Sequence, residues 1–98
     1  MMARKLMKMT NSIELLDWFK HIADIESDYM ASKLLGISKQ MVSAVRNGDR
    51  DFSEYYTLHI LVVGEHPKPL KTMALLESYK AERHGDEKAA KIWREQAA

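Results

Sequence analysis

The spacing of apolar residues between glycines is the feature that most limits what this chain can fold into. Glycines lie at positions 36, 48, 64 and 85, and each follows a segment in which apolar residues recur every three or four positions. Glycine readily takes the left-handed conformation that ends many helices, so this pattern predicts helices separated by glycine-containing turns. A chain of 98 residues is long enough for one compact domain. We therefore expect an all-α protein.

Composition narrows the class of protein further. Apolar residues make up 46% and charged residues 30% of the chain, as in ordinary soluble domains. The chain has no cysteine, which removes disulfides and thiolate metal sites. No stretch resembles a membrane span or a signal peptide, so we expect a cytoplasmic protein. The net charge is only +1, and a polyanionic partner would therefore have to be bound by a local patch.

Periodicity and capping residues predict six helices. The expected ranges are 12–23, 28–36, 38–47, 53–63, 70–83 and 86–96. Asn11 is the expected cap of the first helix, with Glu14 reaching back in the manner of a capping box. Branched residues cluster at 58–63 and suggest a strand there, but no second strand exists to pair with it. A central helix is the better interpretation of this segment.

The helical periodicity also predicts which side chains face inward. From the first three helices these are Ile13, Leu15, Leu16, Phe19, Ile22, Ala23, Ala31, Leu34, Leu35, Met41, Val42 and Val45. In the last two helices, we expect one apolar stripe to face another: Leu70, Met73, Leu76 and Tyr79 against Ala89, Ile92, Trp93 and Gln96.

Three regions follow from this pattern. Residues 1–10 carry Arg4, Lys5 and Lys8 without any acidic residue, and we expect them to form a flexible basic arm. Residues 11–66 would form a compact core of about four helices, and residues 67–98 a C-terminal helical hairpin. The hairpin could pair with its copy in a homodimer, or it could pack back onto its own chain. The sequence leaves both possibilities open.

Residues 29–48 form the most informative segment. Two short helices are separated by about three residues that pivot on Gly36. A steep crossing of two such helices requires a small residue on the first, here Ser32, and branched residues on the second, here Val42 and Val45. The second helix then projects a set of short or amide-bearing side chains, with one amine, away from the core: Ser38, Lys39, Gln40, Ser43, Ala44 and Asn47. A merely solvated helix face would be richer in Glu and Lys.

This segment resembles the helix-turn-helix of the Cro and phage-repressor family. That family places a small residue four positions before the turn glycine, opens the recognition helix with Ser or Thr, and often ends it with Asn-Gly, as at Asn47 and Gly48 here. The resemblance covers residues 29–48 closely and residues 12–63 loosely. It departs at Ser32, where alanine is usual and where the hydroxyl would need a helix carbonyl as partner. The loop 49–52 is also short.

The resemblance implies that the helix beginning at Ser38 enters the major groove of double-stranded DNA. The residues expected to read bases are Ser38, Lys39, Gln40, Ser43, Ala44 and Asn47. The residues expected to contact phosphates are Tyr29, Lys33, Arg46, Arg50, Arg4 and Lys5. Arg50 could instead pair with Asp49 or Asp51. Because one recognition helix covers only a half-site, the resemblance favours a homodimer on a palindromic operator.

Other kinds of site find little support. Asp24, Glu26 and Asp28 alternate like the start of a calcium loop, but the glycine and the closing glutamate of such a loop are missing. The four histidines lack the spacing of metal ligands, and no group of residues indicates an activated nucleophile. We expect no cofactor and no enzymatic activity. The leading hypothesis is a DNA-binding repressor of a phage or mobile element, and the alternative is a protein-binding adapter, inhibitor-like or antitoxin-like, on the same scaffold.

Overall fold

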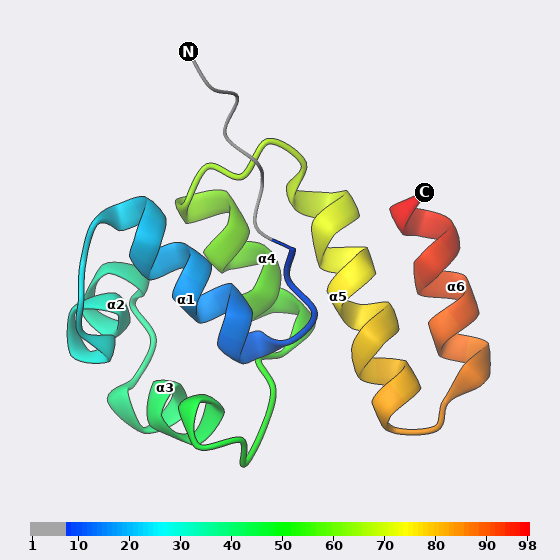
Figure 1. Cartoon of the computed structure of the whole chain (residues 1–98), viewed down its shortest axis with the longest axis horizontal. Helices are drawn as coiled ribbons and strands as arrows, with labels where there is room; N and C mark the ends of the chain where they lie inside the picture. The colour runs from blue at the N-terminus through cyan, green and yellow to red at the C-terminus, as the bar shows by residue number, and fades with distance from the viewer. Residues whose placement is uncertain (1–7) are drawn as a thin grey trace.

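The computed structural model describes residues 8–98, and this part of the chain is all-helical (Figure 1). The helices are α1 Ser12–Ala23, α2 Asp28–Leu35, α3 Lys39–Arg46, α4 Glu54–Val63, α5 Pro69–Arg83 and α6 Glu87–Ala97. The all-α prediction is confirmed, and each boundary lies within two residues of the expected one. Residues 58–63, where a strand was the competing interpretation, belong to α4. Predictions for Arg4 and Lys5 lie outside the described residues.

Side-chain caps explain why the boundaries could be predicted. Asn11 Oδ1 accepts a hydrogen bond from Glu14 N at 2.8 Å, as expected of an N-cap. Glu14 does reach back, but its carboxylate accepts from the backbone and hydroxyl of Thr10, both at 2.7 Å, rather than from Asn11. Ser27 caps α2 and Ser53 caps α4 in the same way as Asn11 caps α1. Local hydrogen bonds therefore define where these helices begin.

The core lies where α1 to α4 meet. Its largest fully buried side chains are Phe52, Leu15, Leu16, Ile60, Leu61, Val42 and Val45. Two predicted core residues are wrong: Ile22 is 47% exposed and Leu34 is 53% exposed. Each lies at the edge of its helix's apolar stripe, and α2 faces the core through Ala31 and Leu35, one turn apart.

The C-terminal hairpin packs onto its own chain through α5. Met73 and Leu76 join the main core, whereas Leu70 and Ile92 are 64% and 59% exposed, so the predicted facing of these residues across the hairpin is wrong. The small residues Ala74, Ser78 and Ala90 are buried outside the main core, where α5 and α6 pack together. Small side chains allow the two helices to approach closely. The C-terminus lies far from α3, at the other edge of the molecule (Figure 1).

A close contact connects α4 to α1. The backbone of Gly64, at the end of α4, lies against the buried ring of Trp18, and a Cβ at this glycine would lie 2.5 Å from a ring carbon. The same ring packs on His66, with 5.3 Å between centroids. Burial lowers the pKa of His66. This contact fixes the direction in which the chain leaves the four-helix core.

Candidate nucleic-acid interface

A tight turn joins α2 to α3. Gly36 has φ 68°, the left-handed conformation, and an added Cβ there would meet no atom within 4 Å. Glycine is therefore favoured at this position by backbone conformation and not by crowding. Ser38 then caps α3 by accepting from Met41 N at 3.1 Å. Buried Ser32 donates its hydroxyl proton to the carbonyl of Tyr29 at 2.7 Å, which confirms the carbonyl partner expected for it.

The turn directs one face of α3 away from the protein. Val42 and Val45 are buried on the inner side of the helix. The six predicted base-reading residues lie together on the outer side, where Ala44 is half-buried and five are exposed: Ser38, Lys39, Gln40, Ser43 and Asn47. Most of them line one shallow hollow of about 460 Å³, which Asp49 also lines. This face offers hydroxyl, amide and amine groups to a partner.

Tyr29 and Lys33, two of the residues predicted to contact phosphates, lie beside this face. The ammonium groups of Lys33 and Lys39 are 5.2 and 5.5 Å from the centroid of the Tyr29 ring. Tyr29 is 51% exposed, so its ring and both ammonium groups can be reached from solvent. The two ammonium groups thus place positive charge around the exposed ring of Tyr29.

Arg46 was also predicted to contact phosphate, and the structure places it in a network of ion pairs. Its guanidinium donates to both carboxylate oxygens of Asp28, at 2.9 and 3.0 Å, and to Asp17 at 2.7 Å. Lys20 also donates to Asp28, at 3.0 Å. The hydrogen bond from Arg46 is the main reason that the pKa of Asp28 falls to about 2, and burial opposes the shift. The pKa of Arg46 is raised, chiefly by its bond to Asp28.

This network ties the end of α3 to the beginning of α2 and to α1. Sequence reasoning missed it because Arg46 is 18 and 29 residues away from its two acidic partners. The phosphate contact of Arg46 stays a prediction. It would require the guanidinium to donate hydrogen bonds to its two carboxylate partners and to a phosphate at the same time.

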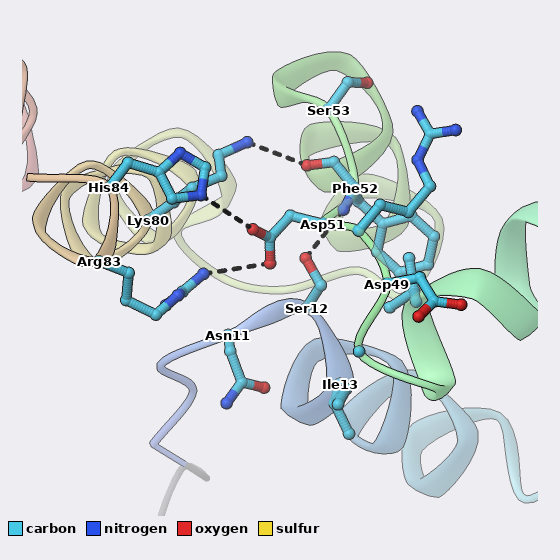
Figure 2. Close-up of a pocket in the computed structure, with 13 residues that line it drawn as sticks. Asn11, Ser12, Ile13, Asp49, Asp51, Phe52, Ser53, Lys80, Arg83 and His84 are labelled. Carbon is cyan, nitrogen blue, oxygen red and sulfur yellow. Dashed lines mark hydrogen bonds and ion pairs between the residues drawn. The ribbon is translucent and has the colours of Figure 1, made fainter.

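The structure also contains a cleft that the sequence did not predict (Figure 2). It has a volume of about 700 Å³ and lies between the start of α1, the loop after α3 and the end of α5. Arg50, Arg83 and His84 are among the residues that line it, together with Asp49 and Asp51. Arg50 is exposed, and within residues 8–98 it pairs with neither Asp49 nor Asp51.

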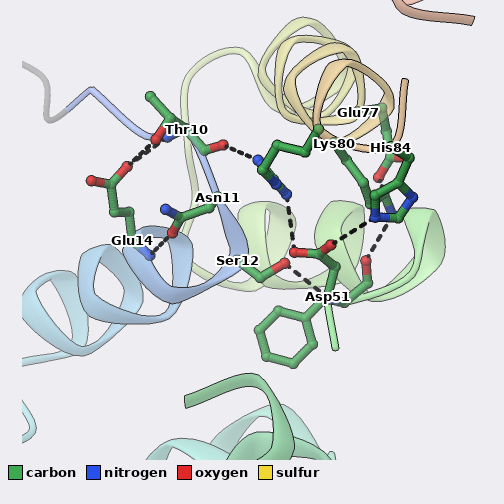
Figure 3. Close-up of polar contacts among 10 residues, drawn as sticks. Thr10, Asn11, Ser12, Glu14, Asp51, Glu77, Lys80 and His84 are labelled. Carbon is green, nitrogen blue, oxygen red and sulfur yellow. Dashed lines mark hydrogen bonds and ion pairs between the residues drawn. The ribbon is translucent and has the colours of Figure 1, made fainter. Parts of the chain in front are cut away.

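Polar contacts at the back of this cleft connect the loop after α3 to α1 and α5 (Figure 3). Arg83 donates to Asp51 at 3.1 Å and to the carbonyl of Thr10 at 3.0 Å. Lys80 donates to the carbonyl of Phe52 at 3.1 Å and pairs with the buried Glu77. Phe52 N in turn donates to Ser12 Oγ at 2.9 Å. The hairpin thereby holds the loop that follows α3 in place.

Over the described range, no three histidine, aspartate or glutamate side chains are grouped so that they could hold a metal ion. Among the helices of residues 8–98, none is long and apolar enough to cross a membrane.

Comparison with known proteins relates this chain to a protein of a phage. The structure defines an all-α protein in which a three-residue turn joins two short helices, the second with an uncovered polar face. No family model matches the chain, and no solved structure matches it. The chain is 63% identical over 92 residues to the uncharacterized protein Gp-c of Pseudoalteromonas phage PM2. The alignment covers 94% of this chain and 100% of the phage protein, so the chain belongs to the family of this phage protein.

Proposed function

We propose that this protein is a sequence-specific DNA-binding transcriptional regulator, a repressor of a phage or mobile element, that acts in the cytoplasm without enzymatic activity. The outer face of α3 is the observation that carries the proposal. Lys39 and Gln40 are exposed at the start of the helix, and no other part of the described chain covers them. An exposed helix with amide and amine groups near its N-terminus suits the major groove, whose base edges offer both donors and acceptors.

The surroundings of α3 support the same function. Tyr29 and Lys33 of α2 would contact the phosphate backbone beside α3, where they would orient α3 without reading sequence. The short turn and the Arg46 network hold α3 against α1 and α2, so that binding would not have to order it. A relative from a phage agrees with a role in a phage or mobile element.

We further propose that the protein binds as a homodimer. One α3 helix spans only a half-site, and two copies related by a two-fold axis would bind a palindromic operator about one helical turn apart. Sedimentation at micromolar concentration would measure the oligomeric state. A monomer both free and on DNA would contradict the dimer without contradicting DNA binding.

Selection of bound fragments from random double-stranded DNA tests the main proposal. We expect enrichment of one palindromic sequence, with an affinity that falls steeply between about 50 and 200 mM salt. Failure to enrich any sequence, with no binding below about 10 µM at low salt, would contradict the proposal. Non-specific DNA binding has a Kd of about 1 to 100 µM at physiological salt and becomes much tighter at low salt, so even a non-specific DNA binder should be detected. Capture of a specific protein in that case would favour the adapter function.

A further inference from the structure

The cleft between the loop after α3 and the end of α5 continues the face that reads DNA. Asp49 lines both the hollow on α3 and the cleft. Figure 1 shows α3 and the turn between α5 and α6 along the same lower edge of the molecule. A duplex lying on α3 would therefore continue past the mouth of the cleft.

The cleft carries hydrogen-bond donors that are available to an anion. The guanidinium of Arg50 is exposed and makes no ion pair within the described part of the chain. The side chain of His84 is 66% exposed, and its Nε2 lies 4.0 Å from a carboxylate oxygen of Asp51, which is beyond hydrogen-bond distance and leaves the ring N–H to donate elsewhere. Asn11 uses its carbonyl oxygen to cap α1, which leaves its amide group to donate. One of the two opposing carboxylates, Asp51, is already occupied by Arg83 (Figure 2).

We propose that this cleft holds a phosphate of the DNA backbone that flanks the bases read by α3, with Arg50 on one wall and His84 of the hairpin on the other. The inference rests on the proposed DNA-binding function and extends it to the C-terminal hairpin. The ligand is a phosphodiester group, which carries one negative charge and accepts hydrogen bonds. Asp49 stands at the mouth of the cleft and opposes the contact, so its removal strengthens binding.

The test measures affinity against salt for the full chain on its selected operator. Arg50→Gln and His84→Gln each remove one proposed donor, and Lys71→Gln is the control because Lys71 is exposed near the opposite end of α5. We expect each cleft variant to bind about threefold to tenfold more weakly at low salt, and Arg50→Gln to lower the salt slope by about one. Asp49→Asn should bind more tightly. Circular dichroism should show that each variant melts as the parent does.

Shortening the operator locates the contact. Removing about five base pairs, half a helical turn, from each end should weaken the parent but not the Arg50→Gln, His84→Gln double variant. An equal loss for both proteins would overturn the inference, while enrichment of an operator would still support the proposed function. A loss for Arg50→Gln alone would overturn the role of the hairpin. Inorganic phosphate at 10 mM is the last probe, and its control is chloride at the same ionic strength, about 20 mM or more near neutral pH. If phosphate weakened operator binding more than this chloride did, the cleft would be a site for a free anion, and the assignment to DNA would be overturned.

Discussion

Arg46 on α3 donates two hydrogen bonds to the carboxylate of Asp28 on α2, and this pair connects the last turn of α3 to the first turn of α2 within the candidate interface. A third bond, to Asp17, extends the contact to α1. The partly buried pair holds α3 from its last turn, while Gly36 and Ser38 determine how it begins.

Breaking the Arg46 network should destabilise the fold. Arg46→Gln leaves Asp28 with only Lys20, and we expect the free energy of unfolding to fall by about 1 to 3 kcal/mol. Urea denaturation followed by circular dichroism would measure the loss. The double variant with Asp28→Asn should cost less than the sum of the two single changes. Additive losses would contradict a direct interaction.

The same pair predicts a dependence of stability on pH. Because folding lowers the pKa of Asp28 to about 2 from 3.8, its contribution is present above pH 4 and is lost as the pH falls toward 2. Because the Asp28 side chain is 32% exposed, solvent screening should reduce its contribution to the free energy of unfolding to about 1 to 2 kcal/mol. Denaturation at pH 6 and pH 2.5 would measure it, and Asp28→Asn should reduce the difference between the two pH values. An unchanged difference would rule out this carboxylate as the source.

Gln40 should contribute to the choice of bases. Gln40→Ala should cost about 1 to 3 kcal/mol at one operator position and little on random DNA. Titration of the operator and of single-base variants would measure both effects. If Gln40→Ala bound the operator with the parent's affinity, Gln40 would have no role in reading it. The exposed Lys71→Gln variant serves as the control that keeps α3 unchanged.

Two glycines should respond differently to alanine. Gly64→Ala would drive a methyl group into the buried ring of Trp18, and we expect a loss of about 1 to 3 kcal/mol with a change in tryptophan fluorescence. Gly36→Ala meets no atom but must keep φ 68°, so we expect about 1 kcal/mol with little spectral change. Equal fluorescence changes in the two variants would contradict this distinction.

The hairpin should be needed for the stability of the loop that follows α3. Arg83→Gln removes the bonds to Asp51 and to Thr10 that hold the loop after α3. In this variant, backbone hydrogen exchange should become faster in residues 49–52 and should change less in α4. Arg94→Gln breaks an exposed pair with Glu82 within the hairpin and is the matched control. Faster exchange in both variants would indicate a general loss of stability instead.

The sequence predicted the helices better than it predicted their contacts. Caps such as Asn11 and Ser38 act on amides three residues away, so local pattern is enough to find them. The Arg46 network and the cleft join residues that are far apart in the chain, and no local signal marks them. The sequence prediction assigned the wrong face of α5 to the contact with α6. It chose the large apolar residues, whereas small residues pack against α6. The sequence did predict that the expected base-reading residues share one face of α3. Once the start of a helix is known, the helical period determines which side chains lie on the same face.

The position of the C-terminus, at the edge of the molecule far from α3, has a practical consequence. A fluorescent reporter or an immobilisation tag joined after Ala98 would stand clear of the polar helix face. Surface-tethered tests of the proposed DNA binding can therefore leave α3 facing the solution, where added DNA can reach it.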